Sequence, residues 1–161
     1  AYCIGSDEIP LHKKISLRMK INGEFVNDTS LYLASVGKDG KFSFLGNKFV
    51  DDCIEAQTNV LGTYVIVKDT ISPIIKPINF KSEGVISDNW SLRVEIDDLE
   101  TGINKYDMYV NNEWVLADYD AKNKLLMYQI DDHIKKGYNT LEVIVTDMLG
   151  NKSVYSTTLQ R

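Results

Sequence analysis

Acidic side chains are the most numerous candidates for chemistry in this chain of 161 residues, which has 23 aspartates and glutamates. Two apolar, β-branched runs close on an aspartate, at Asp69 and at Asp147. Calcium takes roughly six to eight oxygen ligands, so carboxylates from three separate segments could form such a shell. The residues that could converge on a calcium ion are Asp69, Asp97, Asp98, Glu100, Asp147 and Asn151.

The same residues have a second interpretation that involves no metal. Aspartate and asparagine are common at strand ends because their side chains accept hydrogen bonds from nearby backbone amides. Under this interpretation they are ordinary turn and cap residues. Acidic pairs such as Asp51-Asp52 and Asp131-Asp132 fit it equally well, and a catalytic carboxylate pair would need a cleft that two small domains rarely provide.

Aromatic residues form the second candidate site. Tyr106, Tyr109, Trp114 and Tyr119 lie on neighbouring strand-like segments and could form a platform on which sugar rings stack. The alternative is that Trp114 and Tyr119 pack across the edge of a β-sandwich, with apolar area buried and a polar tip in solvent.

Metal and nucleophilic catalysis lack the residues they require. A catalytic zinc needs about three protein ligands and an open position for water, whereas His12 and His133 have no ligand partner at motif spacing. No Gly-x-Ser-x-Gly elbow and no glycine-rich phosphate loop occurs. We therefore expect a protein that is not an enzyme and that needs no cofactor, with calcium as the one possible ion.

Cys3 and Cys53 are the two cysteines, both in the first half of the chain. In an exported protein they could form a disulfide, which by closing a long loop would stabilise a small core by roughly 4 kcal/mol. Alternatively each is a small apolar residue, or Cys3 lies near a lipid-anchor site.

The overall composition excludes several partners. A formal net charge of −5 with scattered lysines gives no attraction to phosphate backbones, so nucleic acid is not expected. No apolar run approaches the roughly 20 residues that cross a bilayer, so membrane insertion is not expected either. The first residues carry no basic-then-apolar signal pattern.

Alternation with period two runs through most of the chain and predicts strands with one buried face. Ile15, Leu17 and Met19 alternate with polar residues, as do Leu92, Val94 and Ile96. No segment predicts a helix beyond a single turn at residues 131–136. The further predicted strands are residues 31–36, 42–44, 52–58, 62–67, 74–80, 105–110, 113–116, 125–130, 140–146 and 153–159, with reversals at 39–40, 111–112, 122–124 and 136–137.

Two all-β domains follow from this pattern. Pro73 cannot donate to a sheet ladder, and the run that ends at Asp69 is echoed by the run that ends at Asp147. We predict two tandem immunoglobulin- or fibronectin-like β-sandwiches, residues 1–69, which could lack N-terminal strands, and residues 70–161. Since the second and sixth strands of such a sandwich run in the same direction, the loops after Asp97 and Asp147 should lie at one pole.

The linear order of several motifs resembles the carboxy-terminal region of exported M23-family (LytM-type) metallopeptidases of Bacteroidetes. In the second unit these motifs are Asp69-Thr70-Ile71-Ser72-Pro73, Asn79-Phe80, residues 97–103, residues 114–120 and Asp147-Met148-Leu149-Gly150-Asn151. In the first unit they are Ile4-Gly5, residues 9–12 and residues 59–65. The His-x-x-x-Asp and His-x-His motifs that hold zinc in that family do not occur here.

The resemblance implies an accessory region rather than the peptidase itself. It predicts a periplasmic or cell-surface spacer that positions a catalytic or other domain of the same parent polypeptide, such as a peptidoglycan endopeptidase, at the cell wall. The alternative is an adhesin-type module whose loops or aromatic face bind a cell-wall glycan or an envelope protein.

Overall fold

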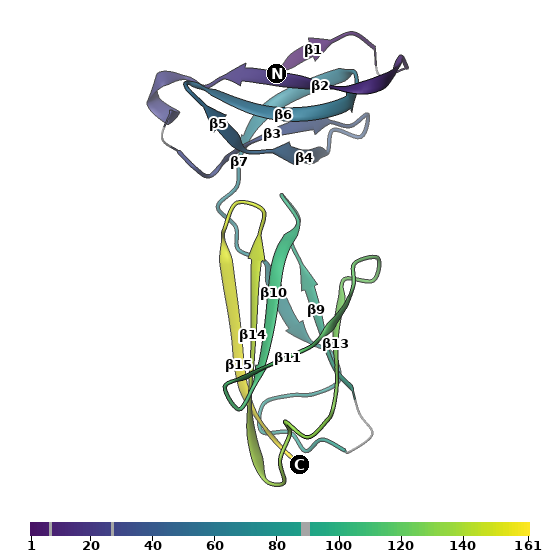
Figure 1. Ribbon diagram of the computed structural model, residues 1–161, viewed down its shortest axis with the longest axis vertical. Helices are drawn as coiled ribbons and strands as arrows, with labels where there is room; N and C mark the ends of the chain where they lie inside the picture. The colour runs from purple at the N-terminus through teal and green to yellow at the C-terminus, as the bar shows by residue number, and fades with distance from the viewer. Residues whose placement is uncertain (7, 27, 88–90) are drawn as a thin grey trace. The chain divides into compact units, whose positions relative to one another are not determined.

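The computed structural model describes residues 1–6, 8–26, 28–87 and 91–161, and its regular secondary structure is almost entirely β-strand (Figure 1). The chain forms two compact units, Ala1–Ile71 and Ser72–Arg161. This division falls two residues after the predicted one. In the part that the structure describes, no helix is long and apolar enough to cross a membrane.

In its described residues the first unit contains seven strands and one short 3-10 helix, η1 (Gly23–Phe25). Its strands are β1 (Tyr2–Ile4), β2 (Pro10–Lys20), β3 (Leu31–Val36), β4 (Phe42–Gly46), β5 (Lys48–Val50), β6 (Cys53–Val60) and β7 (Gly62–Lys68). They form two antiparallel sheets, with strand orders β1-β7-β3-β4 and β2-β6-β5.

The core of the first unit lies between these two sheets. Alternation along β2 buries Leu17 and Met19, which pack with Leu33 of β3, Ile54 of β6 and Tyr64 of β7. The predicted period-two pattern of β2 is therefore confirmed. The pattern identifies the buried residues because successive side chains of a strand point to opposite faces.

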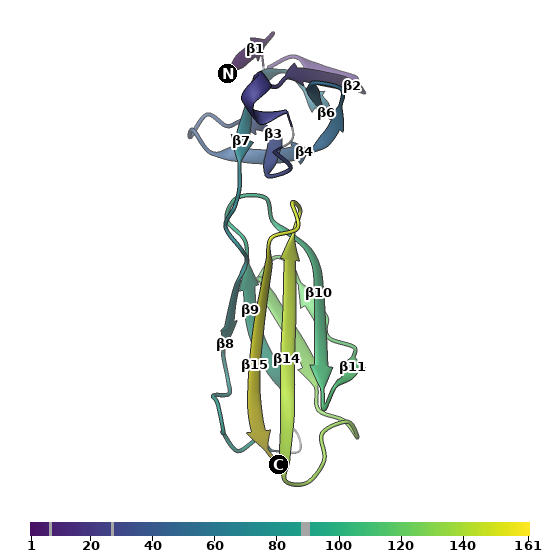
Figure 2. The same ribbon diagram turned by 90° about the vertical axis from the view of Figure 1, so that its left-hand side faces the viewer.

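The second unit is a sandwich of two four-stranded antiparallel sheets. Its strands are β8 (Ile74–Pro77), β9 (Ser91–Asp97), β10 (Ile103–Val110), β11 (Glu113–Val115), β12 (Asp118–Asp120), β13 (Leu125–Gln129), β14 (Tyr138–Asp147) and β15 (Lys152–Gln160). One sheet has the order β12-β13-β9-β8. The other, β11-β10-β14-β15, is called the outer-face sheet below, and Figure 2 shows its strands side by side.

The core of the second unit is formed by the inward faces of both sheets. Leu92, Val94 and Ile96 of β9 meet Leu141 and Val143 of β14 there, all of them inaccessible or nearly so. The predicted class, tandem immunoglobulin- or fibronectin-like β-sandwiches, is confirmed. The strand pairings within this unit match that topology directly.

Several short elements escaped sequence prediction. The strands β1, β5 and β12 have three residues each, too few for a period-two pattern to stand out, and η1 is equally short. The turn at Asn111-Asn112 is as predicted, because both residues have positive φ, 51° and 66°. A hairpin turn of this type matches the right-handed twist of the two strands it joins.

Candidate functional site

The four aromatic residues predicted to form one platform are divided between two environments. Tyr106 and Tyr119 pack against the core of the second unit, with ring centroids 5.2 Å apart and ring planes tilted by 53°. Burial raises the pKa of the Tyr119 phenol, so this side chain stays neutral. The prediction of a single platform is therefore wrong for Tyr106 and Tyr119. Strand alternation turns Tyr106 inward, and Tyr119 belongs to β12, which is in the other sheet.

Tyr109 and Trp114 lie on the solvent-facing side of the outer-face sheet. They are direct partners in the β10–β11 register, so their side chains leave the same face. Trp114 is 54% exposed, and Tyr109 is half-buried. These two residues keep the geometry that a stacking surface requires.

The register extends this pair into a row across four strands. Tyr109 is paired with Glu142 of β14, and Glu142 is paired with Ser156 of β15. Ser156 Oγ donates to Glu142 Oε2 at 3.3 Å. We call this set, Trp114, Tyr109, Glu142 and Ser156, the aromatic row.

Two shallow grooves flank the aromatic row. One, of about 360 Å³, is bordered by Tyr109, Glu142, Ser156 and the hydroxyl side chains of Thr140 and Thr158. The other, of about 300 Å³, runs beside Trp114 between β10 and the segment that follows β11. The row therefore combines aromatic area with hydroxyl and carboxylate groups on an open surface, which suits an extended polar ligand.

The hairpin that carries Trp114 is held by Asn111. The side chain of Asn111 accepts the Thr140 amide at 3.0 Å, and it donates to Asn139 Oδ1 at 2.8 Å and to the His133 carbonyl at 3.0 Å. His133 itself is fixed by Asp131, whose Oδ1 lies 2.8 Å from His133 Nδ1. These bonds tie the β10–β11 turn to β14 and position the aromatic row.

Sequence reasoning missed the β14 and β15 members of this face. The signal was present, since Leu141, Val143 and Val145 mark the inward face of β14 and so assign Thr140 and Glu142 to the outward one. Tyr138, 73% exposed at the start of β14, belongs to the same outward face as Thr140 and Glu142. What the sequence could not supply was the partner of each residue on the neighbouring strands.

The acidic residues converge in part. Carboxylate oxygens of Asp98 and Asp147 lie within 4.8 Å of each other, and the Met148 amide donates to the Gly102 carbonyl at 3.2 Å. The loops after β9 and β14 thus meet at one pole of the second unit. We call Asp98 and Asp147 the acidic pole.

Both carboxylates of the acidic pole accept hydrogen bonds from their own loops. Asp98 Oδ1 accepts the amides of Glu100 (3.2 Å), Thr101 (2.8 Å) and Gly102 (2.8 Å). Asp147, which is fully buried, accepts the Leu149 amide at 2.9 Å and two bonds from Asn151, at 2.8 and 2.7 Å. This is the geometry that the turn interpretation predicts.

The remaining predicted calcium ligands have other partners. Lys124 Nζ lies 2.7 Å from Asp97 Oδ2, so the Asp97 carboxylate is neutralised by a cation. Glu100 contributes its backbone amide to Asp98, and its side chain is half-buried. Asp69 belongs to the first unit, where its amide donates to the Ser30 carbonyl at 2.9 Å, and its predicted part in a metal site stays a prediction.

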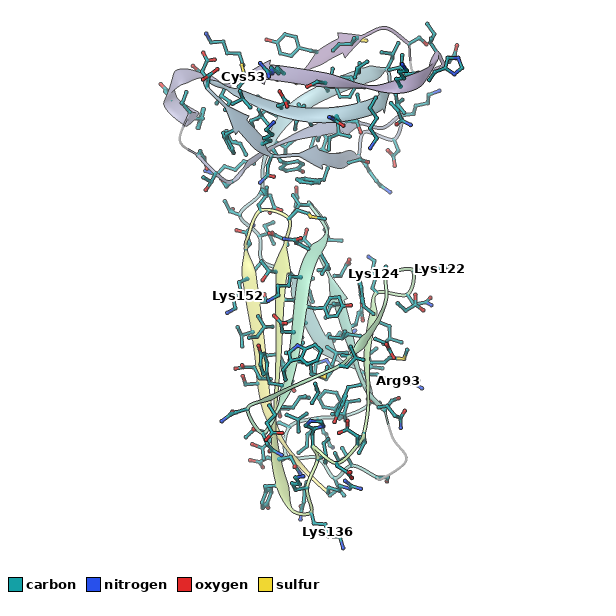
Figure 3. The ribbon with its side chains drawn as sticks, viewed as in Figure 1. Cys53, Arg93, Lys122, Lys124, Lys136 and Lys152 are labelled. Carbon is teal, nitrogen blue, oxygen red and sulfur yellow. The ribbon has the colours of Figure 1, made fainter. Side chains whose placement is uncertain are left out.

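The two cysteines are free thiols, which corrects the disulfide hypothesis. Cys3 is in β1 and is paired with Thr63. Cys53 is the first residue of β6, in the other sheet of the first unit, and is paired with Lys20. Figure 3 labels Cys53, whose sulfur donates to Asp52 Oδ1 at 3.5 Å. Burial and this neighbouring carboxylate raise the pKa of the Cys53 thiol, which keeps it in the unreactive protonated form.

A larger groove of about 700 Å³ lies in the first unit, bordered by the β3–β4 and β6–β7 turns. Its inner polar groups bond within the protein. Thr58 Oγ1 accepts the Val60 amide at 3.2 Å, and the Tyr64 hydroxyl donates to the Val60 carbonyl. The groove is therefore a weaker candidate site than the aromatic row.

Comparison with known proteins finds one family match, to part of the chain, and several solved structures of low sequence identity. Residues 1–69 match the Zu5-like domain family, which is less than half of the chain. No curated protein matches the chain. The chain is similar to fibronectin(III)-like modules of CbhA from Clostridium thermocellum, with 12% identity, 93% of this chain and 86% of that chain covered, and a TM-score of 0.45.

Two further solved structures have comparable similarity. For the endo-beta-1,4-mannanase of Thermotoga petrophila the identity is 14% and the TM-score 0.48, with 57% of this chain and 20% of the mannanase covered. The chain thus spans about a fifth of that enzyme. For the apo expansin of Clavibacter michiganensis the identity is 14% and the TM-score 0.40, with 91% and 76% covered.

Proposed function

We propose that this chain is a non-catalytic accessory region that holds a neighbouring domain of its parent polypeptide at a glycan. The observation that carries the proposal is the aromatic row of the second unit. An exposed tryptophan and a tyrosine on adjacent strands supply flat apolar area, while Glu142 and Ser156 supply hydrogen-bonding groups in register with them. Sugar rings present a similar combination of apolar C–H faces and hydroxyl edges.

The open shape of the face supports binding rather than catalysis. The two flanking grooves are shallow, and the row has one carboxylate, Glu142, at its centre. General acid–base chemistry requires groups that converge on a reacting bond in a site that excludes water. A flat row across a sheet instead suits a ligand that is held and released unchanged.

The experiment is retention of the purified chain on insoluble cellulose, chitin and peptidoglycan sacculi. The double variant Trp114→Ala/Tyr109→Ala should bind at least about tenfold more weakly, since exposed aromatic anchors dominate such interfaces. The matched control, Tyr119→Phe, alters a tyrosine of the other sheet that lines neither groove and should bind as the parent does. If none of the three polymers retains the chain, the proposal that it binds a glycan is wrong, and the remaining interpretation is a spacer that binds no glycan.

The parentage of the region is part of the proposal. Its motifs resemble the tail of exported M23-family peptidases, which supports a place in the periplasm or on the cell surface beside a peptidoglycan endopeptidase. The reading frame that encodes the chain tests this directly. A His-x-x-x-Asp motif followed by His-x-His upstream of Ala1 would support the parentage, and an unrelated upstream domain would contradict it.

A further inference from the structure

We infer that the aromatic row selects glycan chains that carry no acidic groups, and that such a chain lies across the strands from Trp114 toward Ser156. This inference rests on the proposed function and names the class of ligand for the same site. It follows from the position of Glu142, from the location of the nearest cations, and from the direction of the row.

Glu142 places a negative charge at the centre of the row. Its Oε2 accepts a hydrogen bond from a neutral hydroxyl, Ser156 Oγ, at 3.3 Å. Among the residues that the structure describes, Glu142 takes part in no ion pair. A carboxylate in this state accepts hydrogen bonds from sugar hydroxyls and repels uronate, sulfate or phosphate groups.

The cations of the same face do not offset this charge. Lys105 Nζ is bound to Asp107 Oδ2 at 2.7 Å. Lys152 lies at the start of β15, four residues from Ser156, which is about 13 Å along the strand. That separation exceeds the screening length of about 8 Å at physiological salt.

Two other cationic side chains of the second unit emerge from the opposite sheet. Arg93 belongs to β9, and Lys124 directly precedes β13, where it is held by Asp97 (Figure 3). An acidic polymer on the outer-face sheet would therefore meet Glu142 without a compensating cation beside it.

The direction of the row sets the length of the ligand. Its four members occupy paired positions on β11, β10, β14 and β15, and neighbouring strands are about 4.8 Å apart. The row therefore spans roughly 14 Å across the sheet. A ligand that contacts both Trp114 and Ser156 must contain several sugar units, so affinity should rise with chain length.

The test compares two pairs of probes at low salt by isothermal titration calorimetry: hydroxyethyl cellulose with carboxymethyl cellulose, and chitohexaose with a hyaluronan hexasaccharide. In at least one pair the neutral probe should bind about tenfold more tightly than the acidic one. Raising the salt to about 0.5 M should narrow this difference, because charge repulsion is screened.

Glu142→Gln should remove most of the discrimination, so that the affinities for the neutral and the acidic probe of a pair differ by less than about twofold. Glu95→Gln is the control, because it removes the same charge from the other sheet, where Glu95 pairs with Lys76 at 3.6 Å. The inference would be overturned, with the proposed function intact, if the neutral and acidic probes of each pair bind the parent chain equally. It would also be overturned if the ratio of their affinities is the same for Glu142→Gln as for the parent. Absence of binding to every probe would instead overturn the proposed function.

Discussion

The acidic pole and the aromatic row both belong to the second unit, and they use their polar groups in opposite ways. At the acidic pole, Asp98 and Asp147 accept hydrogen bonds from the backbone of their own loops. In the aromatic row, Trp114 is 54% exposed and Glu142 accepts a hydrogen bond from the Ser156 hydroxyl. Polar groups that are satisfied internally stabilise the fold, and those left open to solvent are available to a ligand.

This difference shows why residue type alone misleads. Aspartates suggested a metal site and four aromatics suggested one platform, yet burial and hydrogen bonding separate the structural members of each set from the available ones. The predictions below test that separation, beginning with the largest expected effect.

Asp147→Ala should strongly destabilise the second unit and leave the aromatic row intact in the fraction that folds. The substitution leaves the partly buried Leu149 and Asn151 amides without their acceptor, at a cost of about 3 kcal/mol. Trp114 belongs to this unit, so urea unfolding followed by tryptophan fluorescence measures the change. Asp97→Ala, which removes only a partly exposed ion pair, should cost less than about 1 kcal/mol.

Trp114→Ala and Tyr119→Ala should have opposite effects. Trp114→Ala should weaken retention on the bound polysaccharide about tenfold and change the free energy of unfolding little, because the ring is largely exposed. Tyr119→Ala should lower the free energy of unfolding by about 2 kcal/mol, through lost packing against Tyr106, with retention unchanged. A loss of retention in Tyr119→Ala alone would reverse our assignment of the binding face.

Calcium is a direct test of the acidic pole. Because Asp98 and Asp147 already accept backbone amides, millimolar calcium should raise the unfolding temperature by less than about 1 °C relative to the chain in chelator. Magnesium at the same concentration controls for ionic strength. A rise of several degrees that Asp98→Asn abolishes would mean that the pole binds a cation after all.

The smallest expected effect on stability concerns Asp28 of the first unit. Its carboxylate is bound by Lys68 as well as by Ser30 of its own loop. Hydrogen bonds from Lys68 and then from Ser30 lower the Asp28 pKa from 3.8 to about 2. Since the folded-state pKa is the lower one, this carboxylate contributes its full stability above pH 3.8 and loses it as the pH falls toward about 2.

An NMR titration of the Asp28 side-chain carboxyl carbon measures this pKa. Lys68→Met removes the ammonium donor and should return the midpoint toward its ordinary value. A parent midpoint near 3.8 would show that the pair with Lys68 does not persist in solution.

The sequence by itself determined the fold class and most of the longer strands. Alternation along residues 15–21, 91–97 and 140–146 identifies the buried face of each strand, because side chains of a strand alternate between two environments. Pro73 and the repeated ending at Asp69 and Asp147 place the division between units within two residues. The Asn111-Asn112 turn is likewise encoded locally, since asparagine tolerates positive φ.

Only the tertiary structure decided which residues share a surface. Parity along β10 separates Tyr106 from Tyr109, but the pairing of Tyr109 with both Trp114 and Glu142 depends on strand registers that join segments far apart in the sequence. The positions of the two free cysteines have the same origin, since the strand registers pair Cys3 with Thr63 and Cys53 with Lys20. Local propensity acts over a few residues, whereas a site on a sheet face is assembled by hydrogen bonds between strands, so its members are fixed only when the whole sandwich is formed.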